Sequence, residues 1–316
     1  MKFLREAPPF TQLLFTLIVI LVGGIFVTLL GLLGCLLFMG VRPDALIEMM
    51  SRLEDPGNIS LFKLFQVLQT VGVFILPPLV LAYALDDKPF RFLQLQRKPT
   101  GIAAAIVCVV ILAGGPLIEW LSAINQHLAL PSWLNQVELW MRNSEDQANE
   151  LTRAFLETKS ITGLAGNLFL VAVLPAIGEE LLFRGLLQKL FKRMTGNSHW
   201  AIWITATLFS ALHLQFFGFL PRLLLGALFG YLLEWTGSLW VPVLAHFVNN
   251  ATGVITFFVT GSGLEPDKPD TPVFGSDLLL PALASSLVLW FLLKFLYARK
   301  ITEQAVKESA DHPLMP

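Results

Sequence analysis

Three ionisable residues, Glu179, Glu180 and Arg184, lie inside Ile161–Leu190, a stretch long and apolar enough to cross a lipid bilayer. A charged side chain near the bilayer centre costs about 2.5–3.5 kcal/mol on insertion scales, so such groups usually face a protein interior and mark a functional site. Glu180 and Arg184 are four residues apart and can pair on one helix face. Glu179 is rotated by about 100° on the same helix and points to a different neighbour. We therefore expect one structural and one chemical carboxylate, with a purely structural ion-pair triad as the alternative.

Two histidines in later apolar stretches could complete a hydrolytic site. Phe209 precedes His213 by one helical turn, and a Glu–His pair can hold a water molecule and deprotonate it as a general base. His246 shares a helix face with Asn249 or Asn250, and imidazole and carboxamide N–H groups can converge on an oxyanion. Each motif also has a structural interpretation, because hydrogen bonds between membrane helices are worth about 0.6 kcal/mol on average. Spacing alone does not choose between the two asparagines.

The composition indicates a polytopic membrane protein. Hydrophobic residues make up 55% of the 316 residues and charged residues 14%, against roughly 25% charged in soluble domains. The formal net charge is −1, and no basic tract indicates a nucleic-acid partner. Cys35 and Cys108 fall in predicted membrane segments, so we expect buried thiols rather than a disulfide or a metal pair. The apolar run near the N-terminus is too long for a signal peptide and predicts a first transmembrane helix.

Several other chemistries lack their motifs. Every Asp falls in a predicted loop or tail, which argues against a paired-aspartate membrane protease. The sequence has no H-E-x-x-H motif of a zinc peptidase, no G-x-S-x-G nucleophile elbow and no phosphate-binding glycine loop. The remaining chemistry is attack by a water molecule that Glu and His activate.

The candidate site residues lie on long apolar stretches of the sequence. These stretches predict an all-α fold with about eight transmembrane helices. A spanning helix needs about 20 apolar residues. The sixth stretch is short, and the Leu220-Pro221 break before it is weak, so the count could change by one. The predicted spans are Phe10–Met39, Leu61–Leu85, Gly101–Ile124, Ile161–Leu190, Trp200–Leu220, Pro221–Trp235, Ser238–Val259 and Leu278–Tyr297.

The loop charges predict an orientation. Lys and Arg are more frequent on the side that holds both termini, so both termini should face the cytoplasm. From the rise per residue of a helix, Glu179 lies about 16 Å from the cytoplasmic end of its span, His213 about 20 Å and His246 about 12 Å. We therefore expect a catalytic cavity in the cytoplasmic half of the membrane.

We expect a single integral membrane domain over residues 1–316, with its catalytic core at 161–258 and a polar cytoplasmic tail at 299–316. The connecting segments predict a short amphipathic piece at Asp44–Asp55, an interfacial helix with aromatic anchors at Gln126–Lys159 and an exposed loop at Gly261–Asp277.

The three motifs E-E-x-x-x-R, F-x-x-x-H and H-x-x-x-N occur in this order, each on its own predicted span. In this combination the sequence resembles the CPBP family, which comprises type II CAAX prenyl endopeptidases, bacteriocin-processing and immunity proteins, and related bacterial membrane proteases. The resemblance covers Ile161–Phe258. It implies an intramembrane endopeptidase with an eight-helix fold and a cavity open toward the cytoplasmic side.

The resemblance also implies a role for each motif residue. The family has been described both as metalloproteases and as metal-independent glutamate proteases. A Zn²⁺ ion, if bound, would take Glu179, His213 and His246 as ligands and leave one position for water; we favour the metal-independent chemistry. The implied roles are water activation by Glu179 and His213, support by Glu180 and Arg184, and an oxyanion hole formed by His246 and Asn250.

We therefore expect a glutamate-type endopeptidase in a bacterial inner (cell) membrane, acting on membrane-associated or lipidated protein substrates. The main alternative is a non-catalytic membrane scaffold or bacteriocin immunity partner. A transporter with a proton relay ranks third, because it predicts more intramembrane charges beyond the Glu179 layer than the sequence contains. Nothing in the sequence decides whether the substrate is prenylated.

Overall fold

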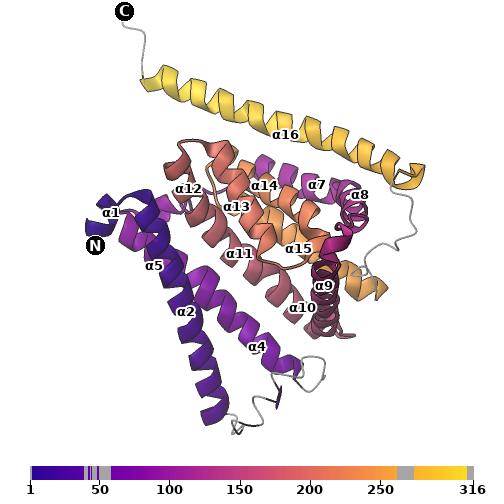
Figure 1. Ribbon diagram of the computed structural model, residues 1–316. Coiled ribbons are helices and arrows are strands. Elements are labelled where there is room, and N and C mark those ends of the chain that lie inside the picture. Colours follow the sequence, from indigo (N-terminus) through magenta and orange to yellow (C-terminus); the bar gives the residue numbers. More distant parts are fainter. Residues whose placement is uncertain are drawn as a thin grey trace, which may run out of the picture.

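Helices form all the secondary structure in the described part of the chain (Figure 1). This computed structural model describes residues 2–38, 58–261 and 274–311, together with Arg42, Asp44, Glu48 and Met49. Side chains of the last helix are described up to Arg299. The predicted amphipathic piece at Asp44–Asp55 and most of the predicted loop at Gly261–Asp277 lie outside these ranges.

The elements follow one another with few long connections. The first half contains α1 (Lys2–Glu6), α2 (Pro9–Phe38), α4 (Ile59–Gln69), η1 (Thr70–Ile75), α5 (Leu76–Leu85), α6 (Pro89–Phe92), α7 (Gly101–Ala113), α8 (Gly115–Gln126), η2 (Ser132–Leu134) and α9 (Asn135–Leu156). The second half contains α10 (Ile161–Asn167), η3 (Leu168–Val173), α11 (Leu174–Glu180), η4 (Leu181–Leu187), α12 (Gln188–Thr195), α13 (Ser198–Ala211), η5 (Phe216–Gly218), α14 (Phe219–Thr236), α15 (Trp240–Thr260) and α16 (Ser276–Asp311).

The prediction of an all-α polytopic membrane protein is confirmed. Six helices in the described ranges are long and apolar enough to span a membrane, or seven if α7 and α8, bent by 43° at their junction, form one span. The predicted span at Trp200–Leu220 is wrong as one helix, because α13 ends at Ala211. With 14 residues it is shorter than the about 20 that a straight span needs. Apolar composition alone did not reveal that break.

The helix that carries the acidic motif runs without a break from Ile161 to Thr195 and contains two π-helical segments, η3 and η4. Segment η3 ends directly before Leu174-Pro175, and η1 likewise ends before Leu76-Pro77. A proline ring crowds the carbonyl four residues earlier, and a wider π turn relieves that contact. The helix is therefore widened to a π-helical turn shortly before Glu179.

This long helix lies at the centre of the bundle. Its η3 and α11 pack against α15, while η4 and α12 pack against α13. On the other side α11 contacts η1, where a Cβ atom on Gly178 would come within 2.9 Å of the Phe74 Cβ. On α14, Gly226 and Gly230 are four residues apart and both lie against α13 residues. These close approaches bring three motif-bearing helices together.

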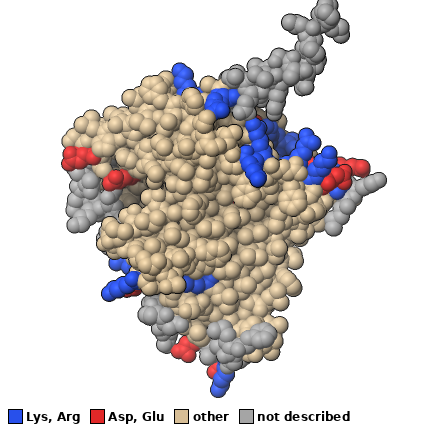
Figure 2. Space-filling model, turned by 180° about the vertical axis from the view of Figure 1, so that it is seen from behind, with Lys and Arg blue, Asp and Glu red and all other residues tan. Residues whose placement is uncertain are grey.

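Two outer helices complete the molecule. Helix α16 lies along the top of Figure 1 against α7 and α8, and its backbone stays helical to Asp311, so the predicted tail at 299–316 is helical for most of its length. Helix α9 falls within Gln126–Lys159, the segment predicted to lie at the membrane interface, and it is too polar to be among the candidate spans. Figure 2 shows a broad area of one face without Lys, Arg, Asp or Glu, as expected for a surface in contact with lipid.

Candidate active site

An ion pair buried between helices anchors the site. The Arg184 guanidinium donates to Glu180 Oε1 at 2.9 Å, and the exposed fractions of the two side chains are 1% and 0%. A second guanidinium N–H donates to the Gly226 carbonyl oxygen of α14 at 2.9 Å. The rings of Phe209 and Phe229 lie 4.5 and 5.4 Å from the guanidinium carbon. The predicted pairing of Glu180 with Arg184 is therefore confirmed, and it also joins two helices.

The same carboxylate oxygen holds a histidine from a third helix. Glu180 Oε1 accepts from His246 Nδ1 at 2.9 Å, and the imidazole stacks on the Phe229 ring at 5.3 Å. A carboxylate only accepts hydrogen bonds, so Nδ1 carries the proton. In a neutral imidazole the other nitrogen, Nε2, is then an acceptor. The sequence did not predict this contact, which orients His246.

Glu179 points away from Arg184 toward His246. The distance from Glu179 Oε2 to His246 Nε2 is 3.8 Å, and the carboxylate side chain is 17% exposed. Among the described residues no hydrogen-bond partner reaches the buried Oε2 atom. The two carboxylates differ in their partners: Glu180 Oε1 is bonded to Arg184 and His246 although its Oε2 also lacks a partner, whereas Glu179 lies beside His246 Nε2 and is partly exposed.

His213 lies in the turn after α13 rather than on the helix. Its Nδ1 is 2.7 Å from the Phe209 carbonyl oxygen, so Nδ1 donates and Nε2 is the acceptor. Its ring lies 4.9 Å from the Phe209 ring, which also meets the His246 ring edge-on at 6.0 Å. The two imidazoles therefore flank one phenyl ring. In the described residues no hydrogen bond joins His213 to Glu179 directly.

The turn that carries His213 is held by hydrogen bonds from α8 and α9. Asn125 donates from Nδ2 to the Phe216 carbonyl at 2.8 Å and accepts from the Leu220 N–H at 2.7 Å. Glu145 Oε2 accepts from the Phe217 N–H, also at 2.7 Å. Burial raises the pKa of the Glu145 carboxyl above its ordinary value, and the bond from Phe217 acts in the opposite direction. These three hydrogen bonds therefore hold the backbone of residues 216–220 against α8 and α9.

Backbone strain shows why such a turn needs support. Leu214, the residue after His213, has a positive φ of 54°, which costs a non-glycine residue roughly 1–2 kcal/mol. Arg222 donates to both the carbonyl and the side-chain oxygen of Gln215 at 3.3 and 2.6 Å. The Trp140 ring of α9 lies 5.3 Å from the Phe216 ring. The interfacial helix and α14 together hold the His213 turn.

Asn250 is bonded to the helix that carries Glu179. Its Nδ2 donates to the Val171 carbonyl oxygen of η3 at 3.0 Å, and its own Oδ1 accepts from Asn249 at 3.2 Å. In a regular α-helix the Val171 carbonyl would accept from residue 175, but Pro175 has no N–H. Asn250 therefore bonds a carbonyl to which Pro175 cannot donate in the α-helical register, and one amide N–H of Asn250 remains for another acceptor.

The candidate metal ligands Glu179, His213 and His246 do not form a ligand cluster in the described part of the structure. Across the described residues no three His, Cys, Asp or Glu side chains lie close enough together to hold a metal ion. Both Nδ1 atoms of the two histidines are already occupied by protein acceptors. Glu179, His213 and His246 thus line one region without forming a metal-ligand cluster.

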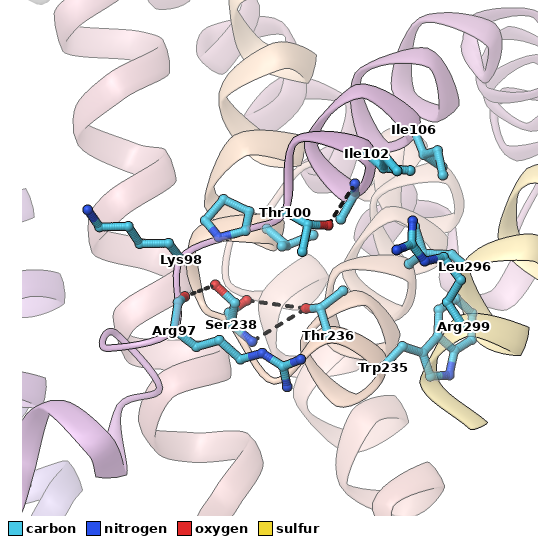
Figure 3. A pocket seen from close by; sticks show the side chains of 13 residues that line it. Arg97, Lys98, Thr100, Ile102, Ile106, Trp235, Thr236, Ser238, Leu296 and Arg299 are labelled. Atoms are coloured by element: carbon cyan, nitrogen blue, oxygen red, sulfur yellow. Dashed lines mark hydrogen bonds between the residues drawn. The ribbon is translucent and has the colours of Figure 1, made fainter. Parts of the chain in front are cut away.

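A small cavity shown in Figure 3 is separate from this site. Its volume is about 50 Å³, and it lies at the N-terminal ends of α7 and α15. Three cations and no carboxylate line it: Arg97, Lys98 and Arg299.

Three further residues near the site were missed by sequence reasoning: Asn125, Glu145 and Arg222. Asn125 lies at the end of a predicted span and is 4% exposed. A buried amide needs hydrogen-bond partners, so an asparagine at this position could have indicated a structural contact. Arg222 interacts electrostatically with Glu145 and Glu179. Their partners are far away in sequence, so spacing alone could not find them.

Comparisons with known proteins agree with the motif resemblance. Residues 161–252 match the family model described as "Type II CAAX prenyl endopeptidase Rce1-like". The chain is also 34% identical over 89 residues to "Uncharacterized protein YpbD" of Bacillus subtilis (strain 168). That match covers 27% of this chain and 42% of the relative, so the chain spans less than half of that protein. No solved structure matches the chain.

Proposed function

Residues 161–252 carry the Rce1-like region, and from this premise we propose that the chain is an intramembrane endopeptidase that hydrolyses peptide bonds of membrane-associated or lipidated proteins. The family model covers the helix with the acidic motif, both histidines and Asn250. The apolar helices of the fold make a bilayer the natural surroundings of that site.

One observation carries the proposal: Glu179, which is 17% exposed, has a buried Oε2 that lacks a hydrogen-bond partner among the described residues and lies 3.8 Å from His246 Nε2. Glu180 also has an Oε2 without a partner, but its side chain is 0% exposed and its Oε1 is held by Arg184 and His246. A free carboxylate oxygen in a protein interior is costly unless another group uses it. A water molecule beside Glu179 would satisfy that oxygen and would be ready for deprotonation.

The proposed chemistry is general-base hydrolysis with Glu179 and His213 as the water-activating pair. The base takes a proton from water, the hydroxide attacks the scissile carbonyl carbon, and the same proton is then given to the leaving amine. His213 suits this task because its Nδ1 is bonded to a carbonyl and its Nε2 is an acceptor. This route needs no metal ion.

The remaining motif residues would position His246 and stabilise the oxyanion that forms during hydrolysis. Glu180 and Arg184 hold His246 in orientation. His246 can donate to an oxyanion from Nε2 only when it is protonated, since Nδ1 already donates to Glu180. Asn250 can contribute the amide N–H that Val171 does not use. The oxyanion hole is thus proposed to form with a protonated His246.

The decisive experiment compares protein termini in the membrane and secreted proteomes of bacterial cells that carry the native chain or Glu179→Ala. New termini that vanish with the variant would support a protease and identify its substrate, including whether that substrate is prenylated. Identical termini, with the variant protein at normal level in the inner membrane, would contradict the proposal and favour a membrane scaffold or an immunity partner.

A further inference from the structure

A basic pocket lies at one end of the bundle, outside the candidate active site. Its volume is about 550 Å³, and its walls come from the α5–α6 connection and from α12. One acidic side chain, Asp86, lines it. Five cations line the same space: Lys88, Arg91, Lys189, Lys192 and Arg193.

The described residues leave several of these cations without a hydrogen-bonded anion, although Asp86 attracts Lys189 electrostatically. Among the described residues no hydrogen bond or ion pair engages the side chains of Lys88, Arg91 or Lys189. Lys192 pairs with Glu234 at 3.0 Å, and Arg193 donates to an amide oxygen of α2. Like charges that face one space repel one another, so a bound anion would stabilise the pocket.

Four of the five cations are exposed side chains and Lys189 is half-buried, and two of the five lie over one buried aromatic ring. Phe92 is 7% exposed and forms its floor, with the Lys189 ammonium 4.9 Å and the Arg193 guanidinium carbon 5.4 Å from its ring centre. Lys189, Lys192 and Arg193 follow an i, i+3, i+4 pattern, which puts them on one face of α12. The cations therefore converge on one volume.

The surroundings indicate a lipid ligand. The pocket lies where the candidate spans Ile59–Leu85 and Ile161–Thr195 end, which is the level of the lipid headgroups. Beside it the aromatic side chains of Tyr83 and Phe90 are 58% and 48% exposed and meet edge-on at 6.2 Å. Exposed aromatic rings are typical of the membrane interface, the level at which lipid headgroups are joined to their acyl chains. Figure 2 shows the molecule after a 180° rotation about the vertical axis, which moves α1 and α5 from the left of Figure 1 to the right. Lys and Arg gather at the upper right of Figure 2, on that side.

We propose that this pocket binds the phosphate group of an acidic phospholipid. Basic pockets between transmembrane helices bind anionic lipid headgroups by this chemistry. The site would adjoin the catalytic helix, because α12 continues without a break from the segment that carries Glu179 and Arg184. The smaller basic cavity of Figure 3, at about 50 Å³, provides a matched control at Lys98 and Arg299.

The test measures lipid retention by native mass spectrometry on the full chain, purified in detergent and stripped of lipid. Phosphatidylglycerol and phosphatidylcholine with identical acyl chains are added separately. We expect retention of phosphatidylglycerol but not of phosphatidylcholine. The double variant Arg91→Gln/Lys189→Gln should bind phosphatidylglycerol about 30-fold more weakly. Each cation near an anionic headgroup strengthens binding by a factor of about five, and the double variant loses two such cations.

The control variant Lys98→Gln/Arg299→Gln should retain phosphatidylglycerol like the native chain. Gel filtration checks that each variant is folded, and Arg91→Gln alone, at an exposed position of a short helix, serves if the double variant aggregates. Equal retention by native chain and pocket variants would overturn the proposal. Displacement of the lipid by an equal concentration of inorganic phosphate would also overturn it, because the site would then serve free phosphate.

Discussion

Asn250 of α15 donates a hydrogen bond, at 3.0 Å, to the Val171 carbonyl oxygen, whose donor in an α-helical register would be position 175, a proline without an N–H. A residue of the H-x-x-x-N motif thus bonds the backbone of the helix that carries the acidic motif. The bond fixes α15, with His246 one turn earlier, against the segment that precedes Glu179.

This relationship predicts thermodynamic coupling between the two positions. Asn250→Ala removes the side-chain donor to this carbonyl and should destabilise the chain by about 1–3 kcal/mol. Pro175→Ala restores an N–H to position 175, so the double variant should regain most of that loss, with a coupling of about 1 kcal/mol or more. Thermal unfolding in detergent measures the cycle, and additive losses would contradict it.

The same cycle separates structure from catalysis. If Asn250 also donates to an oxyanion, the double variant should regain stability while its cleavage activity stays low. Asn249→Ala is the matched control, because Asn249 bonds only to the Asn250 side chain in the described residues. Recovery of activity together with stability would leave Asn250 with a structural role alone.

Glu179→Gln should lower the rate of substrate cleavage by about 10²–10⁴-fold, because a carboxamide cannot accept the proton of water. The substitution keeps the size of the side chain, so yield and melting temperature should stay close to native. Glu119→Gln, which changes an exposed carboxylate elsewhere, should have native activity. A fully active Glu179→Gln protein would exclude Glu179 as the base.

Arg184→Ala should destabilise the protein by about 3–5 kcal/mol, because Glu180 would remain buried and charged beside His246. Lys192→Ala is the comparison, since it breaks a half-exposed pair with Glu234 that is worth about 0–1 kcal/mol. Membrane yield and melting temperature measure both effects. Similar melting temperatures for the two variants would refute an anchoring role for Arg184.

The support of the His213 turn predicts a positioning role for Glu145. Glu145→Ala removes the acceptor of the Phe217 N–H and should lower kcat by about 10–100-fold through misplacement of His213, with a smaller change in KM. Glu145→Gln keeps an oxygen acceptor and should restore most of the rate. Glu150→Gln, on the same helix and exposed, should behave as native. Equal kcat values for Glu145→Ala and native protein would remove this role.

Treatment with a strong chelator should leave cleavage unchanged, because the described Glu179, His213 and His246 side chains do not form a three-ligand cluster. Activity after chelation and metal content of the purified protein are measured together. A loss of activity that added Zn²⁺ restores would show instead that the three side chains move together around a metal ion.

Much of the architecture was predictable because membrane insertion imposes simple rules. Long apolar stretches predicted an all-α polytopic protein, since only helices satisfy their own backbone groups in lipid. Short-range geometry predicted the Glu180–Arg184 pair and the different direction of Glu179, because residues four apart share a helix face and adjacent ones do not. These predictions depend on positions within one helix.

Contacts between helices were not predictable by the same reasoning. The end of α13 before His213, the π turns near Pro77 and Pro175, and the bend between α7 and α8 leave little trace in hydrophobicity. The support of the His213 turn by Asn125 and Glu145 joins residues more than seventy positions apart. Only packing in three dimensions decides which polar groups meet over such separations.

The sequence by itself determined the membrane-spanning character, the motif residues and the pairing within one helix, because hydrophobicity and helical periodicity act locally. The tertiary structure decided that Glu180 holds His246, that Asn250 donates to the Val171 carbonyl, and that five cations face one pocket. Each of these depends on how distant helices satisfy buried polar groups against one another, and that requirement belongs to the folded chain as a whole.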